Sequence, residues 1–292
     1  MSAKTYTLLN GNLVLAARAA VPVADRGFRF GDGVFETIRI HHHVPYQWEL
    51  HQQRLFEGLR SLRITPPVED FTEALKKLLR KNNVKHGFAR ISISRGVGSR
   101  GYAPHPPNLP STWVIETLPA LPKPDAPIAL WLSSIAKIPL QCLPMNQKLA
   151  QGVNQTLALL DAQDHGCDEA LQLTTDGFIC ETASANIFWI REGTLFTPPL
   201  DTGCLNGTTR DAVIRLSPVA VRTQKLGIRA LEKAECVFIT NSRLGIHPVV
   251  TLQPLGIRYK TSHSIMRQLL GLLRDDCTAY TTKHRRFWAG RK

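Results

Sequence analysis

Three groups of residues between positions 148 and 210 have types and an order that could do chemistry together. Lys148 begins a stretch without charge through Leu160, and a lysine amine becomes a nucleophile when its surroundings keep it deprotonated. Glu181 lies in an apolar stretch that predicts a strand, where a carboxylate can keep a bound pyridine nitrogen protonated. Gly207-Thr208-Thr209-Arg210 predicts a helix start whose N–H groups and hydroxyls suit a phosphate. This order predicts an enzyme with a pyridine-phosphate cofactor.

The elements that must position these residues fall into two predicted groups. Alternating apolar and polar residues around Asn10-Gly11 predict a β-hairpin over residues 5–24. Strands are expected at 34–40 and 88–94, and leucines at helical spacing predict helices at 49–62 and 71–79. Together they predict a small α+β domain over residues 1–118.

A proline-rich linker over residues 119–127 is the expected domain boundary. Beyond it, residues 128–292 are expected to form a larger domain. Its expected elements are a strand at 128–133, a helix at 151–163, paired strands at 170–180 and 186–196, a helix at 209–216 and a strand at 235–240. Strands outnumber helices and meet through short turns, which favours a mixed or antiparallel sheet over a Rossmann fold.

Several longer motifs accompany these residues, namely Asp25-Arg-Gly-Phe-Arg-Phe-Gly-Asp-Gly-Val-Phe-Glu-Thr37, Gly177-Phe-Ile-Cys-Glu181-Thr-Ala-Ser-Ala-Asn186-Ile-Phe and Thr197-Pro-Pro. With them, residues 8–250 resemble the class IV (fold type IV) pyridoxal-phosphate enzymes, which include branched-chain and D-amino-acid transaminases and aminodeoxychorismate lyase. The resemblance implies an α+β, D-amino-acid aminotransferase-like fold of two domains. The smaller would be an α/β domain and the larger a mixed β-sheet or pseudo-barrel domain that binds pyridoxal 5′-phosphate.

The resemblance also assigns roles to single residues. Lys148 matches the catalytic lysine that carries the cofactor as a Schiff base, and Glu181, accompanied by Asn186, matches the carboxylate that faces the pyridine nitrogen. The implied phosphate-binding residues are Arg54, Gly207, Thr208, Thr209 and Ser242.

Within the family, three features favour aminodeoxychorismate lyase: the loop at residues 95–102, Thr37 and Asn241. That enzyme converts 4-amino-4-deoxychorismate to 4-aminobenzoate and pyruvate for folate synthesis. Its substrate carries two carboxylates, which Arg90 and Arg100 are expected to bind. Thr37 is expected to act in catalysis and Asn241 to bind substrate, while Phe28 and Phe30 stand where relatives place tyrosines on the substrate side. The alternative is a D-amino-acid or branched-chain transaminase of the same fold.

Composition limits the other function classes. The 292 residues are 43% hydrophobic, and no apolar run approaches the roughly 20 residues of a membrane helix. The N-terminus lacks the plan of a secretory signal, so we expect a cytoplasmic protein without a membrane. The net charge of +13 is dispersed, which favours a small anionic amino substrate over nucleic acid. The resemblance implies a homodimer with a shared active site.

Other noticeable groups have simpler explanations. His41-His42-His43 is expected to be a solvated turn rather than a metal site, and no metal is expected elsewhere. Asp168-Glu169 is expected to cap or pair locally, and Lys76-Lys77 to lie on the polar face of a helix. The basic tail from Lys283 to Lys292 is expected to be solvated. The six cysteines are widely spaced and are expected to be mostly buried thiols.

Overall fold

The computed structural model describes residues 5–106, 108–120, 122 and 124–289, which divide into two compact units. Unit 1 consists of Met1–Pro122, Gln147–Gln151 and Cys277–Lys292, and unit 2 of Lys123–Asn146 and Gly152–Asp276. The expected division into residues 1–118 and 128–292 was linear along the chain. The units differ from it in that two later segments group with unit 1, and one of them contains Lys148.

Unit 1 is built on a six-stranded sheet of order β2-β1-β6-β5-β3-β4. Its strands are β1 (Tyr6–Leu9), β2 (Asn12–Leu15), β3 (Gly33–His41), β4 (Val44–Pro45), β5 (His86–Ser94) and β6 (Thr112–Leu118). The predicted hairpin is confirmed, because Asn10 and Gly11 both have positive φ and join antiparallel β1 and β2.

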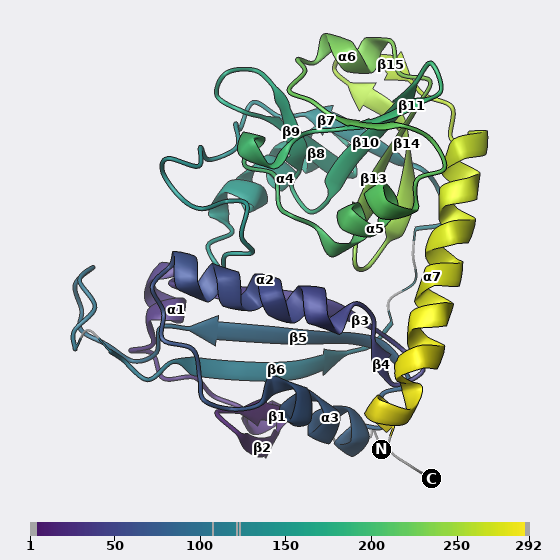
Figure 1. Ribbon diagram of the computed structural model, residues 1–292. Helices are drawn as coiled ribbons and strands as arrows, with labels where there is room; N and C mark the ends of the chain where they lie inside the picture. The colour runs from purple at the N-terminus through teal and green to yellow at the C-terminus, as the bar shows by residue number, and fades with distance from the viewer. Residues whose placement is uncertain (1–4, 107, 121, 123, 290–292) are drawn as a thin grey trace. The chain divides into compact units, whose positions relative to one another are not determined.

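Three helices accompany this sheet: α1 (Arg26–Phe30), α2 (Trp48–Ser61) and α3 (Phe71–Lys81), with the short 3₁₀ helix η1 (Ala16–Arg18) after β2. Asp70 caps α3 by accepting hydrogen bonds from the backbone of Thr72 and Glu73. Burial alternates along β3, so that Glu36, Ile38 and Ile40 are buried. Figure 1 shows α2 running along β3 and β5.

The long helix α7 (Ser264–Ala289) was not predicted. Its basic residues Lys283, Arg285 and Arg286 are exposed, as expected for a solvated tail, but the tail is helical and one of its aromatic residues is buried. The Trp288 side chain is only 2% exposed, and its ring centroid lies 5.6 Å from that of Trp48. The Lys76 ammonium, expected on a polar helix face, is instead buried 3.2 Å from the ring centroid of Phe287. Apolar packing and cation–π contact therefore hold this part of the basic tail.

Unit 2 contains a nine-stranded mixed sheet, which confirms the predicted sheet type. Its order is β12-β11-β10-β13-β14-β7-β8-β9, with β15 paired to β14. The strands are β7 (Ile128–Leu132), β8 (Glu169–Leu173), β9 (Ile179–Thr182), β10 (Asn186–Arg191), β11 (Thr194–Thr197), β12 (Val221–Thr223), β13 (Cys236–Asn241), β14 (Gly245–Gln253) and β15 (Ile257–Arg258).

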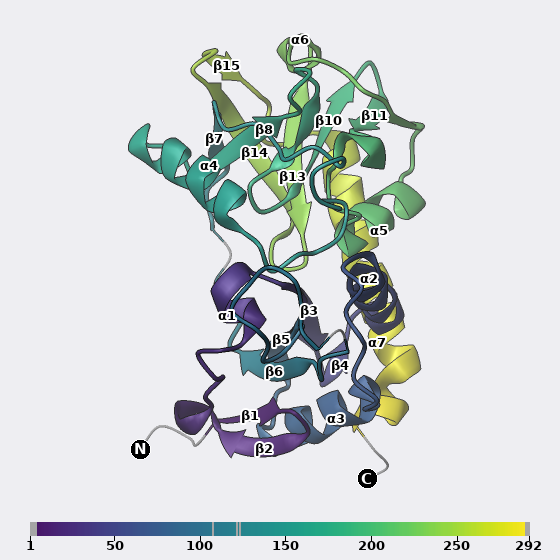
Figure 2. The same ribbon diagram turned by 90° about the vertical axis from the view of Figure 1, so that its left-hand side faces the viewer.

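The strands at the centre of this sheet are buried on both faces. Along β10, Ile187 and Trp189 join one apolar cluster, whereas Phe188 and Ile190 join another that includes Met266. The helices of the unit are α4 (Val153–Asp164), α5 (Thr208–Leu216), α6 (Arg229–Glu232) and the 3₁₀ helix η2 (Leu200–Thr202). Figure 2 shows α4 beside β7 and β8, while α5 contacts β13.

The expected elements of unit 2 agree in part with the structure. The stretches 170–180 and 186–196 each contain two strands joined by a short turn, where Gly177 and Gly193 adopt positive φ. Strands β6, β12, β14 and β15 and helix α6 were not predicted. Among the described residues, no helix combines the length and the apolar character needed to cross a bilayer.

Candidate active site

The segment that carries Lys148 lies beside the first residues of β3. The Phe35 N–H donates to the Lys148 carbonyl over 3.0 Å, and the Ala150 N–H donates to the Gly33 carbonyl over 2.8 Å. A Cβ at Gly33 would overlap the Ile93 carbonyl of the neighbouring strand, so glycine is required there. These backbone contacts fix the Lys148 Cα on unit 1.

Two cationic side chains approach the ring of Phe35. The Lys148 Nζ lies 4.4 Å and the Arg90 Cζ 4.2 Å from the Phe35 centroid. Thr37 is paired with Arg90 across β3 and β5. The predicted residues Lys148, Arg90 and Thr37, far apart in the sequence, are thus brought together on the sheet of unit 1.

A buried carboxylate holds the predicted phosphate-binding arginine. The Arg54 Nε and Nη2 donate to the two oxygens of Glu36 over 2.6 and 2.7 Å. The His51 Nδ1 lies 2.7 Å from the same carboxylate, and since a carboxylate only accepts, this nitrogen carries the proton. Glu36 is fully buried, and His51 and Arg54 are nearly so. One turn of α2 therefore places both partners over β3.

Burial and charge act in opposite directions in this group, which we call the Glu36 cluster (Glu36, His51 and Arg54). Burial by itself raises the pKa of Glu36, but the charge of Arg54 and the contact with His51 outweigh it and hold the pKa well below its usual range. Burial lowers the pKa of His51. The charge of Glu36 raises this pKa in part, whereas the charges of Arg54 and Lys148 lower it further. The cluster therefore holds a carboxylate, a guanidinium and, near neutral pH, an uncharged imidazole.

Other predicted substrate residues lie around α1 and the loop that follows β5. The rings of Phe30 and Tyr102 are 5.4 Å apart, and Arg26 donates to the carbonyl of Tyr102 over 2.7 Å. Phe28 is 75% exposed and Arg100 is also exposed. Phe30 therefore packs against the loop, whereas Phe28 and Arg100 lie at the surface of this chain.

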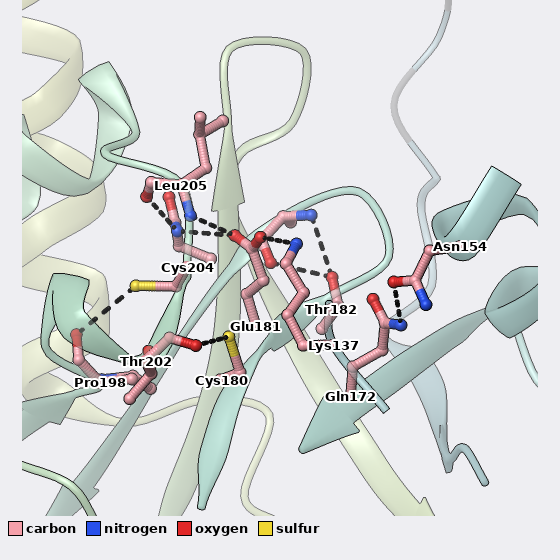
Figure 3. A network of polar contacts seen from close by, with 12 residues as sticks. Lys137, Asn154, Gln172, Cys180, Glu181, Thr182, Pro198, Thr202, Cys204 and Leu205 are labelled. Carbon is pink, nitrogen blue, oxygen red and sulfur yellow. Dashed lines mark hydrogen bonds and ion pairs between the residues drawn. The ribbon is translucent and has the colours of Figure 1, made fainter. Parts of the chain in front are cut away.

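In unit 2, Glu181 lies at the centre of a buried polar network (Figure 3). One of its oxygens forms an ion pair with the Lys137 ammonium. The other accepts from the Leu205 N–H over 3.0 Å and from the Asn186 Nδ2 over 3.2 Å. The carboxylate is held by three donors from three segments of the chain.

Asn186 connects this network to the start of α5. Its Nδ2 also donates to the Leu205 carbonyl over 2.8 Å, and a Cβ at Gly207 would overlap its Oδ1. Gly207 is therefore needed for close packing where α5 begins. Thr208 and Thr209 in the first turn of α5 are both buried, so the predicted anion-binding helix start exists as a local structure.

The turn between β13 and β14 carries the predicted residues Asn241 and Ser242. The Asn241 Oδ1 accepts from the backbone of Arg243 at 3.0 Å and of Leu244 at 2.7 Å, and its Nδ2 donates to the Ser184 carbonyl over 3.2 Å. The side chain expected to bind substrate thus shapes the turn itself. Ser242 is half-buried beside it.

Sequence reasoning missed three residues of these networks. The only sequence signal for a buried Lys137 was its position as a lone charge among apolar residues. The only signal for the pairing of Glu36 with His51 was the one-turn spacing of His51 and Arg54 on α2. Asp168, expected to cap or pair locally, instead accepts from the N–H of Ala129 on β7 over 2.8 Å, 39 residues away.

The histidine-rich turn also differs in detail from expectation. His42 and His43 have positive φ in a turn, as expected, but the ring centroids of His41, His42 and His86 lie 4.5–5.4 Å apart. Within the described part of the chain, no group of three or more His, Cys, Asp or Glu side chains is placed to hold a metal ion.

The chain is similar to known proteins over nearly its whole length. Residues 33–252 match the family model described as amino-transferase class IV. A putative branched-chain-amino-acid aminotransferase of Methanocaldococcus jannaschii is 33% identical over 94% of this chain and 97% of that protein. The aminodeoxychorismate lyase of Bacillus subtilis is 29% identical over 85% and 87%. The crystal structure of the Escherichia coli branched-chain amino acid aminotransferase superposes with a TM-score of 0.85 at 27% identity, covering 92% and 93%.

Proposed function

Because the chain belongs to the class IV aminotransferases, which use pyridoxal phosphate, we propose that it transfers an amino group between an amino acid and a 2-oxo acid. Branched-chain amino acids are the first candidates. The observation that carries this proposal is the 33% identity to the Methanocaldococcus jannaschii protein over 94% of the chain. Most of the similar proteins with assigned names are branched-chain aminotransferases, so the lyase expected from the sequence becomes the second candidate.

The residues present fit the cofactor by their chemistry. They supply an amine at Lys148, a buried carboxylate at Glu181 and a helix start with two hydroxyls at Thr208 and Thr209. Arg54 and Ser242 would add donors for the phosphate. When bound, the cofactor supplies an electron sink that stabilises negative charge on the carbon next to the substrate amine.

Lys148 would move the proton of the reaction. Its Nζ would accept the proton from the amine-bearing carbon of the donor amino acid. In the second half of the reaction it would donate a proton to the corresponding carbon of the product amino acid. The amine must be neutral for this step, and the positive charge of Arg90 at the same Phe35 ring opposes a second charge there. Phe35 itself contributes an apolar surface beside the amine.

Each of the two charged networks would have one task toward the cofactor. Glu36 fixes the plane of the Arg54 guanidinium, which would contact the cofactor phosphate. Glu181 would accept from the pyridine nitrogen, and Asn186 holds both Glu181 and the strand end before Gly207. Both tasks are orientation and charge compensation.

The substrate is a small amino compound with a carboxylate, which Arg90 would bind. Phe28, Phe30 and Arg100 are further candidates for substrate contact, and Asn241 acts on the site through its turn. We also propose that the protein works as a homodimer, in which the exposed Phe28 and Arg100 belong to the shared site.

Aminodeoxychorismate lyase is the second candidate because Thr37 pairs with Arg90 next to Lys148. A hydroxyl beside a carboxylate-binding arginine could protonate a departing enolpyruvyl group. Support also comes from the similarity to the Bacillus subtilis lyase.

The test compares two reactions of the pyridoxal-phosphate-loaded protein. Amino transfer from L-leucine, L-valine or D-alanine to 2-oxoglutarate is followed in one, and release of 4-aminobenzoate and pyruvate from 4-amino-4-deoxychorismate, without any oxo acid, in the other. We expect transfer from a branched-chain amino acid and little lyase activity. Equal release of 4-aminobenzoate and pyruvate without amino transfer would replace the first candidate by the second. Lys148→Ala is the control for both reactions.

A further inference from the structure

Lys137 is a buried cation without a place in the proposed reaction. Its side chain is 3% exposed, and its ammonium pairs with Glu181, which is itself buried. A buried ammonium is costly unless a charged partner and hydrogen bonds compensate it. The pair therefore needs an explanation beyond surface electrostatics.

The backbone around Lys137 is fixed by several hydrogen bonds. The Lys137 N–H donates to the Leu173 carbonyl over 2.8 Å. Asn154 donates to the Ala136 carbonyl over 2.9 Å, and Gln172 to the Ile135 carbonyl over 3.1 Å. Gln172 also donates to the Asn154 Oδ1 over 2.9 Å (Figure 3). These hydrogen bonds fix the loop that carries Lys137, and the loop places the ammonium next to Glu181.

The charge states of the neighbours leave Glu181 as the anion that compensates Lys137. Burial by itself lowers the pKa of Lys137, but the Glu181 carboxylate outweighs it and raises the pKa above its usual value. Burial raises the pKa of Cys180 well above its usual value and that of Cys204 to about 11, so both nearby thiols are neutral at neutral pH. Lys137 is thus an ammonium ion and not a second nucleophilic amine.

We propose that Lys137 is a positioning residue that keeps Glu181 charged and correctly oriented before the cofactor binds. With Lys137 on one oxygen and Leu205 and Asn186 on the other, the carboxylate has a single orientation. The cofactor then meets a carboxylate that is already oriented, so binding does not have to order this side chain. This inference rests on the part of the proposed function that assigns Glu181 to the pyridine nitrogen.

The experiment uses the full chain with Lys137→Met, Lys137→Arg and the double variant Lys137→Met/Glu181→Gln. In the cofactor-free protein, Lys137→Met should lower Tm by roughly 10 °C, because it leaves a buried carboxylate unpaired. Lys137→Arg keeps the charge and should lower Tm by no more than about 3 °C. The double variant, which lacks both charges, should recover most of the loss.

Binding of pyridoxal phosphate gives a second readout. Lys137→Met should raise its dissociation constant at least ~10-fold, and Lys137→Arg by less than ~3-fold. Lys137→Arg keeps the charge, so its rescue of binding separates a role of the charge from a role in which the side chain only fills space.

Lys225→Met is the matched control. Lys225 also pairs with a carboxylate in unit 2, Asp201 at 3.0 Å, but both side chains are largely exposed, and we expect almost no change in Tm or cofactor binding. The proposal is overturned if Lys137→Met behaves like Lys225→Met, or if the double variant is no more stable than Lys137→Met. If Lys137→Met does not fold, folding of the double variant supports the proposal, and its failure to fold contradicts it.

These outcomes are separate from the test of the proposed function. The coupling between Lys137 and Glu181 is measured in cofactor-free protein, where no amino transfer occurs. A wild-type protein without transaminase activity but with this coupling would refute the function and leave the ion pair explained.

Discussion

Among the described residues, a buried carboxylate is paired with a buried cation in each unit, but the two pairs are built differently. In unit 1, Glu36 receives two hydrogen bonds from Arg54 and one from His51, all from one helix. In unit 2, Glu181 receives its donors from Lys137, Leu205 and Asn186, which lie on separate segments.

The proposed roles assign opposite tasks to the two pairs. In unit 1, Arg54 is the proposed phosphate-binding residue, and Glu36 fixes the plane of its guanidinium. In unit 2, Glu181 is the proposed partner of the pyridine nitrogen, and the buried Lys137 ammonium orients it. The carboxylate therefore positions the cation in unit 1, whereas the cation positions the carboxylate in unit 2.

The largest expected effect separates the two lysines. Lys148→Ala should lower the rate of amino transfer by at least about 10³-fold and remove the visible absorption band of the bound cofactor, because the amine that attaches it is lost. Lys137→Met should keep that band at saturating pyridoxal phosphate. Absorption spectra of both variants test this directly. A band that persists in Lys148→Ala and disappears in Lys137→Met would show that Lys137, and not Lys148, attaches the cofactor.

Removing the carboxylate of unit 1 should have the next largest effect. Glu36→Gln leaves Arg54 buried without its anion, and the free energy of unfolding should fall by about 3–5 kcal/mol. Urea unfolding of the cofactor-free protein measures this. Glu57→Gln on the same helix, at an exposed hydrogen bond to Gln53, is the control and should change it by less than about 0.5 kcal/mol. Equal effects of the two variants would show that the Glu36 cluster contributes no more to the free energy of unfolding than an exposed hydrogen bond does.

A smaller effect is expected where α5 begins. Gly207→Ala places a methyl group against the Asn186 Oδ1 and should weaken cofactor binding by roughly 10-fold, since Asn186 also holds Glu181. Gly271→Ala on α7 has nothing within 4 Å of the added carbon and should stabilise the protein by about 0.5–1 kcal/mol. Titration of each variant with pyridoxal phosphate distinguishes the two glycines. Unchanged affinity of Gly207→Ala for pyridoxal phosphate would show that packing at the start of α5 does not affect cofactor binding through the Glu181 network.

The smallest effect sharpens the comparison through pH. The pKa of His51 is lowered in the folded state, so its contribution to the free energy of unfolding is lost as pH falls below about 6.5. The pKa of Glu36 is also lowered, so its contribution is lost as pH falls below about 4.3. The pKa of Lys137 is raised, so its share is complete at neutral pH and is lost only as pH rises above about 10.4.

Unfolding free energies measured from about pH 4 to about pH 11 should therefore fall at both ends. Glu36→Gln should flatten the acid side, and Lys137→Met should flatten the alkaline side. If Lys137→Met changed only the acid side, the assignment of charges in unit 2 would be wrong.

The sequence by itself determined the local elements and the family. Alternation and turn residues predicted β1, β2 and β3 and the mixed sheet, because these signals act between neighbours in the chain. It did not predict β14 or α7. β14 carries Pro248 and begins at Gly245, both of which weaken a strand signal, and α7 was hidden by the charges of a tail that reads as solvated.

The tertiary structure alone decided which charges are buried together. Glu36 and Arg54 are 18 residues apart and Lys137 and Glu181 are 44 apart, and no local pattern links the members of either pair. The free energy of a buried ion pair depends on the solvent removed from both groups and on the distance between them, and both quantities are set by packing between distant segments. The sequence could thus propose Lys148, Arg54 and Glu181 by type and order, whereas Glu36, His51 and Lys137 emerged only from the fold.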